Sequence, residues 1–268
     1  MEKRNNSSPI IPKTAVLVLC VIALAGYMAK SVPVLSKTTM ASYNSTKNKL
    51  LPIYCVETDK KQVALSFDAA WGNEDLRRIL KVLEENDVKA TFFMTGGWVE
   101  SYPEDVKAIY EAGHDLGNHS ENHKQMSTIS KEECKQELQK PHDKVKDLTG
   151  VEMKLFRPPY GDYNDTLIKT AEEMGYYCIQ WDVDSLDWKD YGVEAIIQTV
   201  CEHKHLGNGS IILMHNGAKY TADALDTVIK SLKSEGYELV PISELIMEEN
   251  YKMNHEGRQI AINTGMDN

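Results

Sequence analysis

The stretch VALSFDAAWG, residues 63–72, organises the rest of the chain. Its first five residues are mostly apolar, which is typical of a buried strand. Asp68 follows directly, and an ionised carboxylate is costly to bury without a partner. An ordinary core strand is the alternative interpretation of the apolar run. The place of Asp68 at the end of a buried strand favours a role in chemistry.

Apolar runs that predict strands alternate with helical patterns along most of the chain. The predicted strands span residues 63–67, 90–95, 115–118, 154–157, 177–183, 210–215 and 238–242. The predicted helices span residues 73–86, 103–112, 130–149, 165–174, 193–205, 221–234 and 243–250. Such alternation implies parallel strands joined by right-handed crossovers. We therefore predict an α/β fold, a closed or nearly closed (β/α) barrel, with a doubly wound open sheet as the alternative.

Composition and charge narrow the class of protein. The chain has 268 residues, enough for one large domain with a substantial core. Its net charge is −10, and phosphate binding needs a basic face, so we expect no nucleic acid partner. The five cysteines contain no CxxC pair, so neither a thiolate zinc site nor a disulfide framework is predicted.

Residues 1–35 form a predicted targeting segment. Lys3, Arg4 and Lys13 precede or flank the run 15–29, which is apolar and uncharged. With its flanks, this run approaches the roughly 20 residues that span a bilayer. Positive charge on the N-terminal side keeps that end in the cytoplasm and places the rest of the chain outside.

Two interpretations of this segment remain open, and they share one domain plan. It is either an uncleaved membrane anchor or a signal peptide cut near residues 23–25 or after residue 29. We expect a linker over 36–60, the barrel domain over 61–250 and a polar C-terminal tail over 251–268.

Polar clusters follow six of the predicted strands. They are Asp68 and residues 95–98, 119–123, 157–161, 184–188 and 213–216. Barrels of this kind carry their chemistry at the carboxyl ends of the strands. We therefore expect these clusters to meet at one end of the barrel.

Three residues of these clusters have side chains suited to a metal or a carboxylate. His119 and His123 are four residues apart, so on a helical turn both imidazoles can reach one metal ion. Two surface histidines are the alternative. Arg157 leaves a strand just before two prolines, and from there it can orient a carboxylate bidentately.

The last two clusters combine carboxylates with a histidine. Asp184 and Asp187 either form a helix-capping group or hold His215 in one tautomer and raise its pKa. A histidine held in that way can serve as a general acid. A neutral core histidine is the alternative for His215.

Five motifs of this chain, in their order along the sequence, resemble those of the polysaccharide deacetylases, carbohydrate esterase family 4, also called the NodB-homology domain. The motifs are SFD (66–68), HSENH (119–123), RPPY (157–160), DSLDW (184–188) and LMH (213–215). The resemblance runs from about residue 61 to residue 248 and implies a distorted (β/α) barrel. The form FDAAWG with a short N-terminal anchor looks most like the sporulation branch of this family.

The resemblance implies hydrolysis of N-acetyl groups on the amino sugars of peptidoglycan or of a chitin-like glycan. Asp68 matches the general base that activates water, and Arg157 matches the residue that orients it. His215 matches the catalytic acid, and Asp187 matches its partner. Such an enzyme would work on the outer face of the cell membrane, or secreted to the wall or the spore.

The resemblance also implies a metal site and a substrate pocket. His119 and His123 match two ligands of a divalent metal ion, zinc or cobalt. The backbone N–H of Tyr160 matches an oxyanion donor. Trp188 and Leu213 match the walls of the pocket for the acetyl methyl group.

Position 69 departs from the family pattern. The family usually carries there a second aspartate, which is the third metal ligand, whereas this chain has Ala69. Catalytic zinc normally has three protein ligands, so we expect weaker metal binding. Asp182 and Glu121 are the candidates for a replacement ligand. A non-catalytic glycan-binding or structural wall protein on the same barrel is the alternative function.

Overall fold

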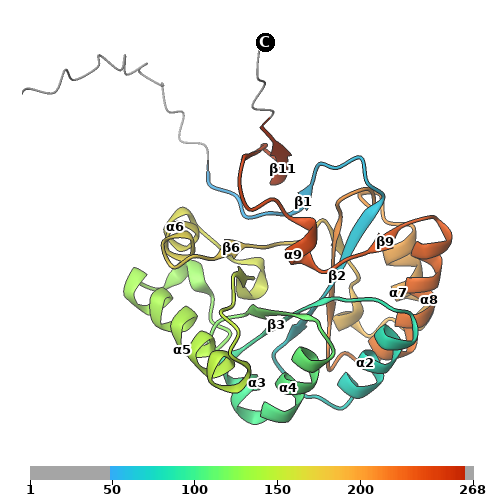
Figure 1. Ribbon diagram of the computed structural model, residues 1–268, viewed down its shortest axis with the longest axis horizontal. Coiled ribbons are helices and arrows are strands. Elements are labelled where there is room, and N and C mark those ends of the chain that lie inside the picture. Colours follow the sequence, from blue (N-terminus) through green and yellow to red (C-terminus); the bar gives the residue numbers. More distant parts are fainter. Residues whose placement is uncertain (1–48, 263–268) are drawn as a thin grey trace, which may run out of the picture. The chain divides into compact units, whose positions relative to one another are not determined.

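A computed structural model describes residues 49–262, which are built around one parallel sheet (Figure 1). Seven strands follow one another in the order β6-β5-β4-β3-β2-β8-β7, and β9 pairs with the start of β2. The strands are β2 (Gln62–Ala69), β3 (Thr91–Met94), β4 (Asp115–Asn118), β5 (Leu155–Phe156), β6 (Tyr177–Cys178), β7 (Val183–Asp184), β8 (Ile211–His215) and β9 (Glu238–Leu239). The sheet curls into a half-barrel, which confirms the predicted distorted (β/α) barrel.

Both faces of β2 are buried, which explains its continuous apolar run. Val63, Leu65, Phe67 and Ala69 pack in the larger core with the helices, whereas Ala64 packs in a second apolar cluster on the opposite face. Side chains alternate along a strand, so Asp68 points away from the helices. Ala69 points toward them.

The predicted strand 177–183 is two strands in the structure. Its beginning is β6 and its end leads into β7, and these lie at opposite ends of the curled sheet. Between them the backbone changes partners: Gln180 N–H donates to the carbonyl of Ile53, and Asp182 N–H donates to the carbonyl of Ile211. The prediction of one strand was wrong because an apolar run does not show which neighbour each residue pairs with.

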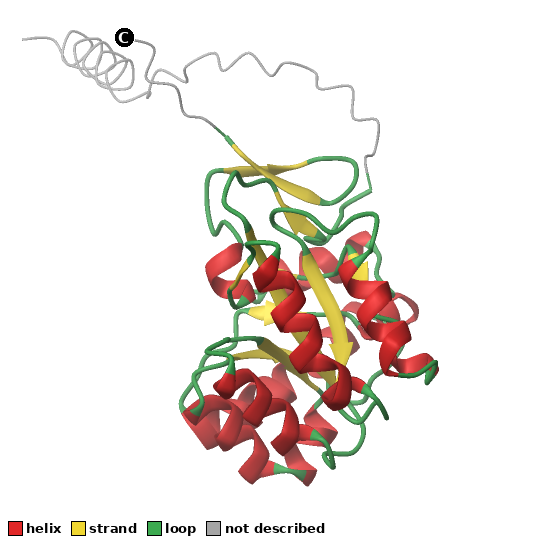
Figure 2. Ribbon diagram, turned by 90° about the vertical axis from the view of Figure 1, so that its right-hand side faces the viewer, coloured by secondary structure: helices red, strands yellow, loops and turns green. Residues whose placement is uncertain are grey.

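Except for the last one, the helices pack against the outer face of the sheet, whereas α9 (Ile242–Leu245) packs on the opposite face, in the apolar cluster that contains Ala64 (Figures 1 and 2). The others are α2 (Leu76–Glu85), α3 (Gly96–Ser101), α4 (Pro103–Glu111), α5 (Lys131–Thr149), α6 (Asp165–Glu173), α7 (Val193–Cys201) and α8 (Thr221–Ser234). The helix α5 begins at the predicted capping box of Ser130 and Glu133 and ends at Gly150, whose φ is 78°. The last predicted helix, 243–250, is shorter than expected and ends at Leu245.

The C-terminal residues form a second, three-stranded sheet. It contains β1 (Cys55–Val56), β10 (Tyr251–Met253) and β11 (Arg258–Ala261) in the order β1-β11-β10. Residues 251–262 of the predicted tail and the end of the predicted linker are therefore folded. The prediction of a loose tail rested on the polar composition of this segment. It was wrong because these strands are held by backbone hydrogen bonds and by one buried side-chain amide, not by an apolar core. The Gln259 side chain donates to the carbonyl of Met247 and accepts from its N–H.

The predicted targeting segment, residues 1–35, and most of the predicted linker lie outside the described residues. Among residues 49–262, no helix is both long and apolar enough to cross a bilayer.

Candidate active site

The predicted motifs meet at the carboxyl ends of the strands, around a cavity of about 720 Å³. Its lining includes Asp68, His119, His123, Tyr160, Trp188, Leu213 and His215. The cluster 95–98 does not line this cavity. Instead, Thr95 caps α3 through the N–H of Trp98, and the Trp98 indole N–H donates to the carbonyl of Gly72. That cluster therefore supports a neighbouring loop.

Asp68 is held by a buried ion pair. Arg157 Nη1 donates to Asp68 Oδ1 over 2.7 Å, and the arginine side chain is fully buried. Its other terminal nitrogen donates to Ser66 Oγ at 2.8 Å and to the carbonyl of Gln180 at 3.2 Å. Burial raises the pKa of the Asp68 carboxyl, but the charge of Arg157 and its hydrogen bond to the carboxylate oppose this and help to hold that pKa below its ordinary value. Asp68 is therefore an ionised carboxylate at neutral pH, as a general base requires.

The two predicted metal ligands lie side by side, with ring centroids 4.9 Å apart. His119 Nδ1 donates to the carbonyl of Arg157 at 2.7 Å, which leaves Nε2 unprotonated, 3.4 Å from Asp68 Oδ2. Burial lowers the pKa of both histidines, that of His123 to about 4, so both rings are neutral at pH 7. The buried Nδ1 of His123 has no hydrogen-bond partner within the part of the chain that the structure describes. Two neutral imidazoles with free nitrogens suit a divalent metal ion.

A third ligand is missing from this pair. Ala69 has no donor atom, and its side chain packs among the core residues. Asp182 is engaged elsewhere, by Ser210 Oγ and the N–H of Ile211 at 2.9 Å each. Glu121 is paired with Lys144 at 2.7 Å. No cluster of three or more histidine, cysteine or acidic side chains able to hold a metal ion occurs within residues 49–262. The donor set therefore fits two of the three positions of a catalytic metal site.

The predicted acid is held by a complete hydrogen-bond network. His215 Nδ1 lies 2.7 Å from Asp187 Oδ1, and Asp187 Oδ2 accepts from the backbone N–H of His215 at 2.7 Å and from Thr221 Oγ1 at 2.6 Å. Burial lowers the pKa of His215, but the hydrogen bond and charge of the fully buried Asp187 raise it above its ordinary value. Asp184 is not the partner, because its carboxylate accepts from the N–H of Leu186. Thr221 was missed because it lies outside the motifs, at the start of α8, six residues after His215.

We call Asp187, His215 and Thr221 the acid half of the cavity. Asp68, Arg157, His119 and His123 are the base half. Asp68 and His215 are register partners on the adjacent strands β2 and β8, which places the predicted base beside the predicted acid.

Strained backbone conformations concentrate in the loops that line the cavity. Non-glycine residues with φ between 52° and 67° include Ser120, His123, Tyr160, Leu186 and Asp190. Each such residue costs about 1–3 kcal/mol and persists only where its surroundings enforce it. Tyr160 and Trp188 hold exposed side chains over the cavity, whereas Leu213 is buried in its wall. The roles assigned to these residues stay predictions, but the structure brings all of them together.

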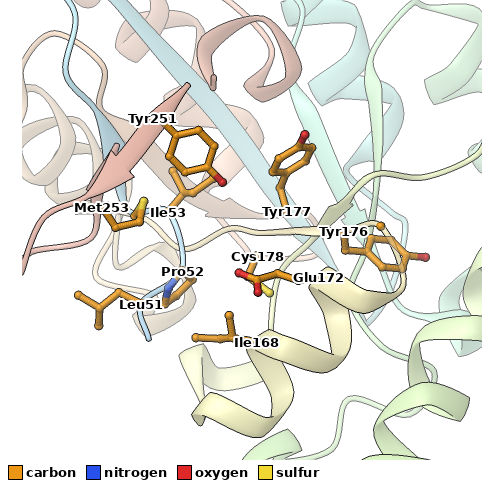
Figure 3. Close-up of a pocket in the computed structure, with 11 residues that line it drawn as sticks. Leu51, Pro52, Ile53, Ile168, Glu172, Tyr176, Tyr177, Cys178, Tyr251 and Met253 are labelled. Atoms are coloured by element: carbon orange, nitrogen blue, oxygen red, sulfur yellow. The ribbon is translucent and has the colours of Figure 1, made fainter. Parts of the chain in front are cut away.

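A second, smaller cavity of about 250 Å³ lies at the opposite ends of the strands, where β6 begins (Figure 3). It is lined mostly by apolar and aromatic side chains, with the carboxylate of Glu172 and the thiol of Cys178. Burial raises the pKa of the Cys178 thiol, so it stays protonated and is a poor nucleophile. This cavity has no acid–base pair comparable to Asp68 and His215.

The fold and the cavity define a (β/α) barrel protein with a carboxylate and a histidine, each held by a buried partner, at its strand ends. The chain belongs to the polysaccharide deacetylase family, whose sequence model matches residues 56–179. It is 38% identical over 218 residues to an uncharacterized 30.6 kDa protein of Geobacillus stearothermophilus, covering 78% of this chain and 80% of that one. It is 31% identical to the peptidoglycan-N-acetylmuramic acid deacetylase PdaA of Bacillus subtilis, and the alignment covers 78% of this chain and 81% of that one.

A solved structure adds a contrast. BA3943 of Bacillus anthracis, a CE4 family pseudoenzyme, is 37% identical, with a TM-score of 0.70 over 78% of this chain and 70% of that one. A mutant of BA3943 with restored enzymatic activity has also been solved, with the same TM-score and 38% identity over 78% of this chain and 72% of that one. The family therefore includes both named deacetylases and a pseudoenzyme at comparable similarity to this chain.

Proposed function

We propose that this protein removes N-acetyl groups from amino sugars of cell-wall or spore peptidoglycan. The observation that carries the proposal is the pair Asp68 and His215, which line one cavity from adjacent strands. Each is held by a buried partner, Arg157 and Asp187 respectively. The named peptidoglycan deacetylases among the relatives support the choice of substrate.

In the proposed reaction, Asp68 accepts a proton from water as the water oxygen bonds to the acetamide carbonyl carbon. Arg157 keeps the carboxylate aimed and ionised. His215 then donates its proton to the sugar nitrogen as the C–N bond breaks, which gives acetate and a free amine. Because its pKa is raised, His215 is protonated in a larger fraction of the molecules at neutral pH, as a general acid requires.

The family implies a divalent metal ion, zinc or cobalt, which His119 and His123 would hold. When bound, such an ion polarises the acetamide carbonyl and lowers the pKa of water. Since Ala69 supplies no third donor, we expect weak metal affinity, and activity that depends on added metal.

Glycan binding without turnover is the second candidate function. Two observations favour it: Ala69 in place of a ligand, and the similarity to a CE4 pseudoenzyme. On this hypothesis the cavity would hold an N-acetylated glycan that is never cleaved.

Acetate release separates the two functions. Purified protein is incubated with peptidoglycan and with a tetramer of β-linked N-acetylglucosamine, in EDTA and at increasing zinc or cobalt, while bound metal is measured in parallel. We expect acetate release that rises with metal and falls by at least about 100-fold in His215→Ala, since general acid–base catalysis contributes about 10²–10⁴-fold. Glycan binding without acetate at saturating metal would establish the second function instead.

We also propose that residues 15–29 bring the barrel to the outer face of the cell membrane, as an anchor or as a cleaved signal. Membrane fractionation with N-terminal sequencing of the mature protein tests this. An intact N-terminus in the soluble cytoplasmic fraction would exclude both forms.

A further inference from the structure

An exposed tryptophan stands at the mouth of the cavity and has no role in the proposed reaction. Trp71 is 65% exposed and lines the cavity from the loop after β2. Large aromatic side chains are usually buried, because each has about 150–250 Å² of surface to remove from water. An exposed one beside a reactive cavity indicates a surface that a ligand covers.

The backbone beside this side chain is fixed, although the indole is exposed. The carbonyl of Gly72 accepts from the Trp98 indole at 2.7 Å and from the Asn216 amide at 3.1 Å. A Cβ on Gly217 would lie only 2.4 Å from the Trp71 carbonyl oxygen, so a glycine is needed for the two loops to pack this closely. The backbone that carries the indole is therefore held in advance, so a ligand that covers the ring has only the side-chain rotamer of Trp71 to order.

Trp71 also begins a row of rings along one wall of the cavity. Its ring lies 4.6 Å from that of His123, and the His123 ring lies 4.4 Å from that of Tyr160, both edge-on. The row continues to His119, which reaches the base Asp68. The rings of His123 and His119 thus separate Trp71 from the base.

We propose that Trp71 is a stacking platform for a sugar ring of the glycan, next to the unit whose acetamide reaches Asp68. This inference rests on the proposed glycan substrate and adds a subsite to it. A pyranose ring has a face of C–H groups that can cover an indole. A second exposed tryptophan, Trp188, lines the cavity from the loop after β7, so the two tryptophans lie on opposite sides of β8. Stacking needs no metal, so this subsite holds glycan whether or not the histidines are loaded.

Calorimetric titration with the β-linked N-acetylglucosamine tetramer in EDTA tests the platform. We expect Trp71→Ala to weaken binding about tenfold, which corresponds to about 1.4 kcal/mol. Trp71→Phe should keep most of the affinity, because it retains an aromatic face. Tyr110→Ala is the matched control, since Tyr110 is 45% exposed on α4 and does not line the cavity. Thermal unfolding of each variant checks that its fold is intact.

Acetate release by the same variants keeps this inference separate from the proposed function. Tetramer affinity that is unchanged in a folded Trp71→Ala overturns the platform, even if the wild-type protein releases acetate. Loss of affinity in Trp71→Ala, but not in Tyr110→Ala, supports the platform even if no acetate is released. If turnover occurs, we expect Trp71→Ala to raise KM for the tetramer by a larger factor than it lowers kcat, because the ring would contact the glycan but supplies no reacting atom.

Discussion

Asp187 uses both of its oxygens inside the protein, whereas His123 leaves a buried ring nitrogen without a partner in the described residues. The acid half of the cavity is a closed network of carboxylate, histidine and threonine. The base half contains a second unpaired buried atom, Nε of Arg157. Buried polar groups are nearly always satisfied, and exceptions concentrate where a group has a catalytic role or binds water or an ion. The acid half therefore satisfies its buried carboxylate within the protein, whereas the base half leaves an imidazole nitrogen available to a ligand.

The largest effect should come from breaking the one closed ion pair of the base half. Arg157→Met leaves the Asp68 carboxylate buried and unpaired, so we expect the free energy of unfolding to fall by about 3–5 kcal/mol. Urea denaturation near pH 7 measures this. The control is Arg78→Met, which breaks an exposed pair with Asp223 and should cost at most about 1 kcal/mol. Similar losses for both variants would show that burial of the pair is unimportant.

Restoring the missing ligand sharpens the comparison further. Ala69→Asp places a carboxylate in an apolar core, and we expect a loss of at least about 2 kcal/mol in EDTA. Added zinc should recover part of that loss, because Ala69 is the last residue of β2 and a loop follows it.

The neutral variant Ala69→Asn is the control for this experiment, since it should be destabilised and gain little from zinc. Thermal unfolding with and without zinc gives the comparison without any measurement of activity. Equal responses of the two variants would mean that a carboxylate at position 69 cannot turn toward the histidines.

A smaller effect is expected on the titration of the acid half. Asp187→Asn removes the charge that does most to raise the pKa of His215. Burial, the largest effect on this group, is then opposed only by the charges of Asp68 and Asp184, so that pKa should fall below the ordinary histidine value. In the wild-type protein, the pair stabilises the fold fully below about pH 6.5 and less as pH rises through the folded pKa. In the variant, His215 should instead cost stability as pH falls.

Histidine ring signals followed by NMR against pH test the titration, with His255 as an exposed internal reference. A His215 signal that titrates at the same pH in both proteins would contradict the role of Asp187.

Much of the site was predictable because each motif follows a strand. Parallel strands bring their carboxyl ends together, so Asp68, His119, Arg157 and His215 had to meet once the barrel formed. The choice between Asp184 and Asp187 was not predictable, since both flank the same short loop. Trp71 lies in the stretch FDAAWG and Thr221 lies outside every motif, but no local pattern gives either a role. The packing of α8 and of the loop around Gly217 places them at the cavity.

By itself the sequence determined the alternation of strands and helices, the residue types of the acid–base pair, and the absent ligand at position 69. These are local features, recorded by periodicity and by order along the chain. Tertiary structure alone decided that the segment 177–183 divides between two edges of the sheet, and that β11 pairs with the distant β1. It also decided that Ala69 faces the core while Asp68 faces the cavity. Those outcomes depend on backbone hydrogen bonds and contacts between segments far apart in the chain, which no local pattern encodes.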